Sequence, residues 1–412
     1  MAEVENAVVN IAILGYGTVG SGVYQIVNEN QAVLRRKCGK DLVVKYVLDL
    51  REFPGDPVQE ILTHRFEDVL EDDSVRLVVE VMGGVEPANT FVTACLSKGK
   101  SVVTSNKELV ARHGSRLIRL ARENHCNFLF EASVGGGIPI IRPLISSLTA
   151  DDILEIKGIV NGTTNYILSE MTRYGKTFEE VLALAQEFGY AEKDPAADVE
   201  GYDACRKDAI LCSLAFGKTV DYQEIPTEGI THISAKDIEY AKAMGRTIKL
   251  LAYGKKSEKG VTARVAPYLL PDDHPLSRVD GVFNAVFIKG NMLGDTVYYG
   301  RGAGKLPTAS AVVSDVVDAI KHFGRNIIID WSEEKQSVLP TDAVETCQLI
   351  RISESLLPLA RQLFPQAEVV DLPQPDGELA VVTGVESEHS VAEKIQKLAA
   401  AGTVLGAIRM QD

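Results

Sequence analysis

Hydrophobic positions in the first third of the chain alternate between runs typical of buried strands and spacings typical of helices. Residues 8–14 form a short β-branched run that ends in a glycine cluster, which predicts a buried strand entering a turn. The alternation continues through a helix at 21–36, a strand at 42–48, residues 66–70, a strand at 77–81, a helix at 89–98, a strand at 101–104, a helix at 108–123 and a strand at 127–131. We therefore predict an α/β fold for residues 1–135, a Rossmann-type doubly wound parallel sheet with right-handed crossovers.

The pattern changes after residue 150 to a mixture of strands and long helices. Strands are predicted at 153–160, 262–270, 285–289 and 295–300, and helices near 163–173, 178–188 and 203–216. This mixture predicts an α+β domain with an open sheet over residues 136–305, which we expect to bind the substrate and to pair across a dimer axis. A helix over 306–323 is apolar on one face, so we expect residues 306–335 to return to the first domain.

The last segment, residues 340–412, predicts a third domain. Its pattern is strand, helix, strand, strand, helix, strand, at 347–352, 355–363, 368–372, 378–383, 390–401 and 403–409. This order predicts a ferredoxin-like arrangement.

Composition and charge narrow the class of protein. The chain has 412 residues, 45% hydrophobic and 24% charged, which is the balance of a soluble protein with several cores. Its apolar runs are far shorter than the roughly 20 residues that cross a bilayer, and residues 1–10 lack the basic region of a secretory signal. We therefore expect a cytoplasmic protein without a membrane partner. The net charge of −14 argues against nucleic acid, and six cysteines without zinc or CxxC spacing predict neither disulfide nor zinc site.

The first candidate site is a glycine-rich turn between the first strand and the first helix. It consists of Gly15, Tyr16, Gly17, Thr18, Val19 and Gly20. Glycines there permit a tight turn and close approach to a pyrophosphate, whose charge the helix N-terminus stabilises. Asp49, which closes the second strand, is placed to accept hydrogen bonds from ribose hydroxyls and favours NAD, whereas Arg51 favours the 2′-phosphate of NADP. The pattern predicts a dinucleotide site and leaves the choice of cofactor open.

A second candidate site lies at the end of a predicted parallel strand, where ligands bind in this architecture. Residues 104–108 read Thr-Ser-Asn-Lys-Glu, and Lys107 is placed to reach a substrate carboxylate or the nicotinamide. A solvated lysine at a helix start is an equally simple interpretation.

The third candidate site is a charged run at residues 189–195, followed by Asp198, Asp203 and Lys207. Asp203 and Lys207 are four residues apart and share a helix face, which by itself is typical of a weak surface ion pair. The helix continues with the nearly all-apolar residues 209–216, so these charges border a buried element and need partners. This favours a functional role.

Six stretches of the sequence are similar, in order, to motifs of one enzyme family. They are residues 13–20, 104–111, 131–141, 158–168, 189–211 and 300–315. Over roughly residues 8–330 the chain resembles the homoserine dehydrogenases. The resemblance implies NAD(P)-dependent interconversion of L-aspartate 4-semialdehyde and L-homoserine, in the biosynthesis of threonine, methionine and isoleucine. No aspartate-kinase region precedes residue 8, which indicates the monofunctional form.

The resemblance also implies roles for individual residues. Lys207 corresponds to the general acid/base, supported by Asp203, and Lys107 to a second lysine near the carbonyl and the nicotinamide. Further residues are implied in binding: Glu192, Asp198 and Thr163 for the substrate and Gly302 for the cofactor.

The loop at 131–138 resembles the family's loop for a structural Na⁺ or K⁺ ion. The implied ligands are carbonyl oxygens of Glu131, Val134, Gly136 and Ile138. A tight loop without an ion explains the glycines nearly as well.

The segment from residue 340 resembles an ACT domain, a regulatory module, most clearly in its last strand at 404–409. Residues 349–357 lack the usual Asp and Pro-Gly of that module, which leaves amino-acid binding and threonine feedback open. We expect a homodimer, with a homotetramer formed through this segment as the alternative.

Two rival functions make different predictions. An aspartate-semialdehyde dehydrogenase needs an activated cysteine, and the six cysteines lie outside any supporting motif, although Cys205 is near Lys207. A catalytically silent NAD(P)-binding sensor predicts loss of Glu192, Asp203 and Lys207, all of which are present.

Overall fold

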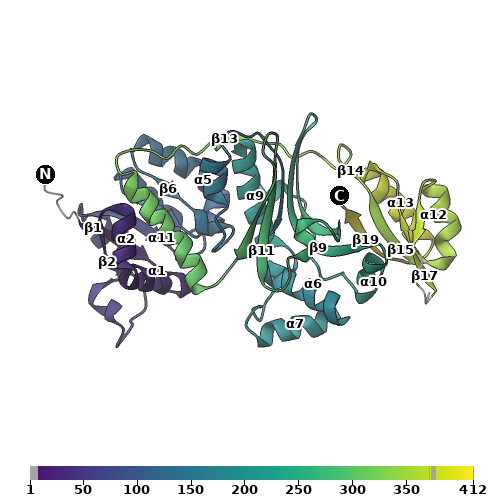
Figure 1. Cartoon of the computed structure of the whole chain (residues 1–412), viewed down its shortest axis with the longest axis horizontal. Helices are drawn as coiled ribbons and strands as arrows, with labels where there is room; N and C mark the ends of the chain where they lie inside the picture. The colour runs from purple at the N-terminus through teal and green to yellow at the C-terminus, as the bar shows by residue number, and fades with distance from the viewer. Residues whose placement is uncertain (1–7, 371, 373–376, 412) are drawn as a thin grey trace. The chain divides into compact units, whose positions relative to one another are not determined.

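A computed structural model describes residues 8–370, 372 and 377–411 of the chain (Figure 1). The described chain forms two compact units. Unit 1 consists of residues up to 151, 209–221 and 300–335, and unit 2 of residues 152–208, 222–299 and 336 onward. Residues 1–7, on which the signal-sequence prediction partly rests, lie outside the described residues.

Unit 1 is built on a six-stranded parallel sheet. Its strands are β1 (Val8–Leu14), β2 (Asp41–Leu48), β3 (Leu62–Thr63), β4 (Val75–Glu80), β5 (Ser101–Thr104) and β6 (Phe128–Leu129). Their spatial order is β3-β2-β1-β4-β5-β6, and every neighbouring pair is parallel. This is the order of the doubly wound dinucleotide-binding fold, so the predicted fold class is confirmed.

Helices cover this sheet, and one of them comes from far along the chain. They are α1 (Thr18–Glu29), α2 (Gln31–Cys38), α3 (Phe66–Leu70), α4 (Ala88–Ser97), α5 (Lys107–Glu123) and α11 (Lys305–Lys321). Helix α11 packs on α1, as Figure 1 shows, and a Cβ atom on Gly22 of α1 would lie only 2.9 Å from the Cβ of Ala309. Val312 and Val316 of α11 join Ile11 of β1 in one buried core.

Two predictions for unit 1 were wrong in detail. The single helix expected at 21–36 is broken at Asn30, whose backbone (φ −102°, ψ 21°) is not helical. The side chain of Gln31 then donates to the carbonyl oxygen of Leu42 (2.6 Å), which fixes the start of α2 beside β2. The strand expected at 127–131 ends at Leu129, because a 3₁₀ turn begins at Glu131.

Unit 2 contains a nine-stranded mixed sheet. Its order is β12-β11-β7-β9-β10-β19-β15-β17-β16. The strands are β7 (Ile153–Ile159), β9 (Arg246–Ser257), β10 (Gly260–Pro271), β11 (Phe283–Gly290), β12 (Gly294–Arg301), β15 (Gln348–Ser353), β16 (Glu368–Val370), β17 (Glu378–Val382) and β19 (Val404–Met410). The helices are α6 (Gly162–Tyr174), α7 (Phe178–Glu187), α8 (Ala196–Val199), α9 (Tyr202–Phe216), which continues into unit 1, α10 (Ala235–Ala243), α12 (Leu357–Leu363) and α13 (Glu388–Ala401).

Strand β9 and helix α10 were not predicted from the sequence. Lysines interrupt the apolar pattern of β9, and one of them, Lys249, is only 1% exposed. Its ammonium group donates to the carbonyl oxygen of Val279 (2.6 Å) and to Oδ1 of Asn165 (3.2 Å). A lysine whose ammonium group has buried hydrogen-bond partners can lie inside the protein. Lys249 therefore did not indicate a surface position, and the strand was not predicted.

The C-terminal module, residues 348–410, has the predicted succession of elements. Its sheet order is β19-β15-β17-β16 with antiparallel neighbours, which is the ferredoxin-like arrangement. Strand β19 also pairs in parallel with β10, through Tyr268 with Arg409 and Leu269 with Met410. The module therefore extends the central sheet of unit 2. The first three residues of the strand predicted at 368–372 form β16, and residue 371 lies outside the described residues.

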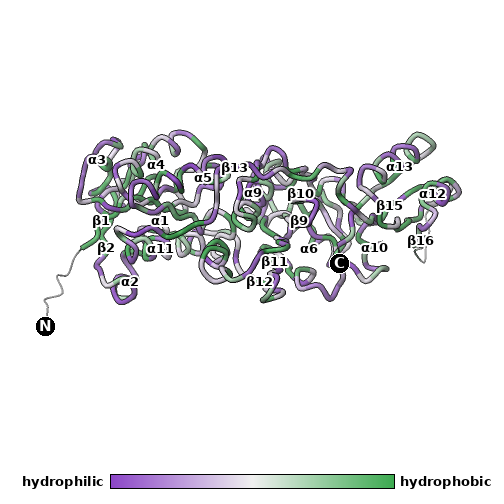
Figure 2. The backbone as a smooth tube through the Cα atoms, turned by 90° about the horizontal axis from the view of Figure 1, so that it is seen from above, coloured by the Kyte–Doolittle hydropathy of each residue, from purple (hydrophilic) through white to green (hydrophobic). Residues whose placement is uncertain are grey.

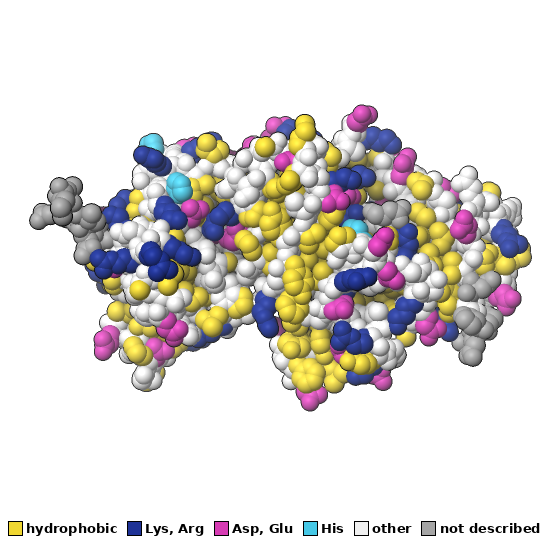
Figure 3. Space-filling view, viewed as in Figure 1, with side chains coloured by type: hydrophobic (Ala, Val, Ile, Leu, Met, Phe, Trp, Pro, Cys, Tyr) yellow, Lys and Arg dark blue, Asp and Glu magenta, His cyan; other side chains and the backbone are white. Residues whose placement is uncertain are grey.

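Hydrophobic and hydrophilic stretches alternate along the backbone, as Figure 2 shows. Basic side chains gather over α2, which ends in Arg35, Arg36 and Lys37, whereas charges of both signs are interspersed elsewhere on the visible face (Figure 3). Within 8–370, 372 and 377–411, none of the helices is both long enough and apolar enough to span a bilayer.

Candidate active site

The glycine-rich turn of unit 1 has the geometry of a phosphate cradle. Gly15 adopts a left-handed backbone (φ +97°) directly after β1, and Gly17 precedes the first residue of α1. A Cβ atom on Gly20 would lie 2.0 Å from the carbonyl oxygen of Gly15, so only glycine allows this close approach. A Cβ atom on Gly17 would meet no heavy atom within 4 Å. The main chain at the start of α1 is thus open to a phosphate group, as dinucleotide binding requires.

Asp49 and Arg51 form an ion pair beside this turn. The main-chain amide of Tyr16 donates to Oδ2 of Asp49 (2.7 Å), and the Arg51 guanidinium donates to both carboxylate oxygens (2.9 and 3.0 Å). The hydrogen bonds from Arg51, the largest cause, lower the pKa of Asp49, so its carboxylate stays ionised. The Arg51 side chain is 61% exposed and can turn toward a ligand without crossing the core.

A cavity of about 530 Å³ lies next to the Asp49–Arg51 ion pair. Gly15, Gly17, Asp49 and Arg51 line one part of it, and Phe66 and Phe91, stacked with centroids 4.0 Å apart, belong to another. An apolar wall facing a carboxylate and a guanidinium suits a flat base attached to a ribose. The residues present therefore fit NAD or NADP.

Lys107 is the first residue of α5, and its neighbours fix the start of that helix. The Asn106 side chain caps the helix by accepting from the amide of Leu109 (3.1 Å), and it donates to the carbonyl oxygen of Gly84 (2.6 Å). The amide of Asn106 in turn donates to Oγ1 of Thr104 (2.9 Å). Three hydrogen bonds thus determine where the main chain presents Lys107.

Glu80, at the end of β4, supports the loop that precedes α5. Its role was not predicted from the sequence. Its fully buried carboxyl accepts from the Thr104 hydroxyl (2.6 Å) and from the amide of Met82 (2.9 Å). Burial raises the pKa of Glu80, against the opposing effect of these hydrogen bonds. The available signal was a glutamate directly after the apolar run 77–79.

In unit 2, the predicted residues Asp198, Asp203 and Lys207 are brought together. The Lys207 ammonium donates to Oδ2 of Asp203 and to the carbonyl oxygen of Val160, both at 2.7 Å. The side chains of Lys207 and Asp203 are only 12% and 7% exposed. The interpretation as a solvated surface pair is therefore wrong.

Asn161 joins the two acidic residues and was also missed. Its amide nitrogen donates to Oδ1 of Asp198 (2.7 Å) and to Oδ2 of Asp203 (3.0 Å). Its carbonyl oxygen accepts from the amide of Thr164 (2.9 Å), which caps α6. The Asn-Gly-Thr-Thr sequence at a strand-to-helix junction was the signal for this cap.

Thr163 and Glu192 lie on segments that are linked to each other. The Thr163 hydroxyl donates to the carbonyl oxygen of Tyr190 (2.7 Å), and the Gln186 side chain donates to the carbonyl oxygen of Glu192 (3.0 Å). The Glu192 side chain is exposed, and among the described residues its carboxylate has no ion-pair partner within 4.0 Å. This carboxylate is available to a cationic group.

The loop that follows β6 is closed by Glu131. Its buried carboxylate accepts from the amides of Ile140 (2.6 Å), Ile141 (2.8 Å) and Arg142 (2.7 Å), so this side chain fixes the main chain of residues 140–142. A Cβ atom on Gly136 would lie 2.1 Å from the carbonyl oxygen of Gly302. The predicted cofactor residue Gly302 thus contacts the predicted cation loop, within unit 1. Among the described residues no cluster of His, Cys, Asp or Glu side chains could hold a metal ion.

Comparison with known proteins identifies the family. The family model described as "Homoserine dehydrogenase" matches residues 139–317, and that of "Homoserine dehydrogenase, NAD binding domain" matches residues 15–131. A homoserine dehydrogenase of Bacillus subtilis is 43% identical over 351 residues, which cover 84% of this chain and 81% of the relative. The chain belongs to the homoserine dehydrogenase family. It is accordingly an NAD(P)-dependent oxidoreductase, and the predicted family and enzyme class are confirmed.

Solved structures extend the likeness to the whole fold. The crystal structure of a homoserine dehydrogenase from Thiobacillus denitrificans matches 98% of both chains with a TM-score of 0.90 and 36% identity. A hyperthermophilic archaeal homoserine dehydrogenase mutant, solved in complex with NADPH, matches 76% of this chain and 97% of its own with a TM-score of 0.65 and 31% identity. The predicted cofactor class, NAD or NADP, is confirmed.

Proposed function

We propose that the chain interconverts L-aspartate 4-semialdehyde and L-homoserine with Lys207 as the general acid/base. The observation that carries this proposal is the double anchoring of the Lys207 ammonium by Asp203 and the Val160 carbonyl. An ammonium group has three protons to donate, and these two bonds occupy two of them. The third direction is left for a substrate oxygen.

The proton transfer follows from this arrangement. Bound NAD(P) supplies or accepts the hydride at the reacting carbon. When the aldehyde is reduced, Lys207 donates a proton to the oxygen that gains negative charge, and when the alcohol is oxidised, the neutral amine accepts the hydroxyl proton. Asp203 keeps the amine in place in both directions.

The binding roles follow the charges of the side chains. Glu192 is proposed to bind the amino or the hydroxyl end of the substrate, with Asp198 and Thr163 as further substrate-binding residues of unit 2. Lys107 is proposed as the second lysine, near the substrate carbonyl and the nicotinamide. The cofactor residues are proposed as the glycine-rich turn, Asp49, Arg51 and Gly302.

The remaining proposals concern the location, pathway, assembly and regulation of the enzyme and a bound cation. They are a cytoplasmic location, a role in threonine, methionine and isoleucine biosynthesis, a homodimer or homotetramer, and regulation through an ACT-like C-terminal module. A Na⁺ or K⁺ ion held by carbonyl oxygens of Glu131, Val134, Gly136 and Ile138 is proposed as structural. Activity that is unchanged when both ions are replaced by a bulky organic cation would contradict the last proposal.

The test is an assay of the purified protein with homoserine and either NAD or NADP. Reduced nicotinamide should form, Lys207→Ala should abolish turnover, and binding of the reduced cofactor, measured by its fluorescence, should persist. Near-normal kcat in Lys207→Ala would contradict the role of Lys207. Phosphate-dependent acyl transfer would instead support the rival function, that of an aspartate-semialdehyde dehydrogenase.

A further inference from the structure

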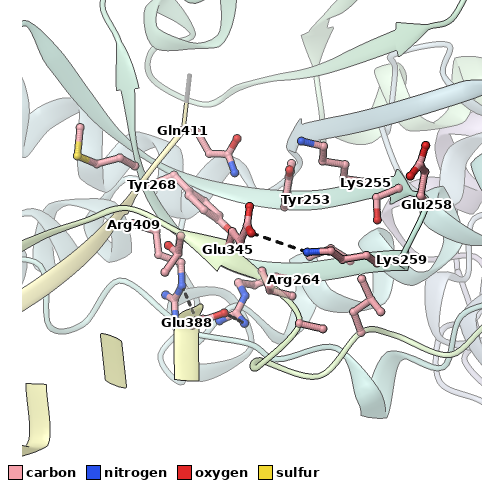
Figure 4. Close-up of a pocket in the computed structure, with 17 residues that line it drawn as sticks. Tyr253, Lys255, Glu258, Lys259, Arg264, Tyr268, Glu345, Glu388, Arg409 and Gln411 are labelled. Carbon is pink, nitrogen blue, oxygen red and sulfur yellow. Dashed lines mark hydrogen bonds and ion pairs between the residues drawn. The ribbon is translucent and has the colours of Figure 1, made fainter. Parts of the chain in front are cut away.

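Glu228 connects the last strand of the C-terminal module to the core of unit 2. The guanidinium of Arg409, on β19, donates to both of its carboxylate oxygens (2.7 and 2.8 Å). Arg264, on β10, lies 3.6 Å from the same carboxylate. Arg409 and Arg264 also both bind Glu388, at the start of α13. Figure 4 shows Arg409, Arg264 and Glu388 converging at one end of a cavity.

Arg264, Arg409 and Glu388 line that cavity of about 400 Å³, and together with Glu228 they form a balanced group of charges. Arg264 and Glu388 are buried, and two guanidiniums face two carboxylates. Burial would raise the pKa of Glu228, but the hydrogen bonds and charge of Arg409 outweigh it and lower the pKa. The arginines are thus satisfied by the carboxylates of the protein itself. Loss of Glu228 would leave two guanidiniums sharing Glu388 in a poorly solvated place.

The main chain around Glu228 is fixed on its other side by β10. The amide of Glu228 donates to the carbonyl oxygen of Val265 (2.8 Å), and the amide of Val265 donates to the carbonyl oxygen of Pro226 (3.0 Å). Residues 226–230, which we call the wedge segment, therefore run along the strand next to β19. The side chain and the main chain of Glu228 are both anchored.

The wedge segment contacts the residues that precede α9. The amide of Ile230 donates to the carbonyl oxygen of Val199 (2.8 Å). A Cβ atom on Gly229 would lie 2.2 Å from that oxygen, so the two main chains touch and any other residue would separate them. Movement of the wedge segment must displace residues 199–201.

Residues 199–201 lie between Asp198 and Asp203 of the candidate active site. The amide of Cys205, in the first turn of α9, donates to the carbonyl oxygen of Gly201 (2.9 Å). Lys207 follows half a turn later and takes its position from Asp203 and from Val160. The position of residues 199–201 therefore sets how α9 begins.

We propose that Glu228 is a positioning residue through which the C-terminal module orients the start of α9. With Arg409 in place, the wedge segment supports residues 199–201 and places Lys207 for proton transfer. The proposal rests on the role of Lys207 proposed above. Neither Glu228 nor Arg409 belongs to the candidate active site, and in this proposal both act through the main chain of 226–230 and 199–201.

The test compares Glu228→Gln, Arg409→Gln and the double variant in the full-length enzyme. We expect each single variant to lower kcat roughly tenfold, because small misplacement of a reacting group is costly. The KM for NAD(P) should stay unchanged, and the pH profile of kcat should shift, because the contact between Lys207 and Asp203 is altered. The double variant should lose little more than either single variant, since the two residues act as one pair. Arg409→Lys, which keeps the charge, should retain more activity than Arg409→Gln.

A matched control is offered by Arg351, which also ties the C-terminal module to the central part of unit 2. It pairs with Asp237 of α10 (2.8 Å) and with Glu378 (3.2 Å), and it is as buried as Arg264. Arg351→Gln should lower thermal stability as Glu228→Gln does and should leave kcat unchanged. Equal kcat values in the two variants, whether both normal or both reduced, would overturn the proposal. Turnover by Lys207→Ala would refute the proposed role of Lys207 separately.

Discussion

Lys207 and Asp203 form an ion pair with 2.7 Å between Nζ and Oδ2, on one face of α9 and largely out of solvent. The four-residue spacing was visible in the sequence, but its meaning depended on burial. A surface pair of this kind contributes little, whereas a buried pair with the Val160 carbonyl as a second acceptor fixes the ammonium in one place. The pair is therefore suited to directing a proton.

Replacing Asp203 by asparagine should test whether its charge matters. Asp203→Asn keeps the shape but removes a charge-assisted hydrogen bond worth about 1.5–3 kcal/mol, which corresponds to roughly 10–100-fold in kcat if the bond acts in the transition state. Steady-state kinetics with homoserine would measure the loss. Glu239→Gln, which breaks the exposed Lys236–Glu239 pair of α10, should leave kcat unchanged. An equal effect in both variants would contradict a catalytic role for the charge.

Cofactor choice should depend on Arg51. If its guanidinium leaves Asp49 to bind a 2′-phosphate, Arg51→Ala should lower the ratio of kcat/KM for NADP to that for NAD by roughly 10–100-fold. Activity with NAD should persist, because Asp49 is then released to the ribose hydroxyls. Arg65→Ala, which removes another exposed arginine of unit 1, is the control. A ratio that does not change would show that Arg51 does not bind the phosphate.

Sequence reasoning predicted the elements whose hydrophobic pattern is regular and the motifs whose glycines have a geometric cause. It therefore identified the parallel sheet, the turn at Gly15 and Gly20, and the acidic and basic residues around α9. It missed Glu80, Asn161 and Lys249, because a polar residue among apolar ones does not reveal its distant partner. The link between Glu228 and Arg409 spans 181 residues and was equally invisible.

Glu80 should support stability through its hydrogen bonds. Glu80→Ala leaves the Thr104 hydroxyl and the Met82 amide without their buried acceptor, at a cost of about 1–3 kcal/mol for each group. We expect a lower free energy of unfolding and a higher KM for NAD(P), because the loops that start α5 loosen. Glutamine keeps one side-chain oxygen that can accept from the Met82 amide, whereas alanine keeps none. Glu80→Gln should therefore be much milder, and equal losses in the two variants would contradict this account.

The pH dependence of stability should carry a contribution from Asp315 on α11. Its buried carboxylate accepts from the amide of Glu131 (2.8 Å) and pairs with Arg142. Burial, the largest cause, together with the charge of Glu131, raises the pKa of Asp315 to about 7. An aspartate of the unfolded chain has a pKa of about 3.9, so between these two values the folded protein binds more protons than the unfolded one.

Stability should therefore fall as the pH rises from about 4 to about 7, with a slope of up to about 1.4 kcal/mol per pH unit from this group. Asp315→Asn should flatten that slope. Trp331, the single tryptophan of the chain and buried in unit 1, reports unfolding of the same unit by fluorescence in denaturant. Asp318→Asn, which alters another partner of Arg142, should keep the slope of the parent protein. If Asp315→Asn and the parent protein lost stability in parallel across this pH range, the raised pKa of Asp315 would be wrong.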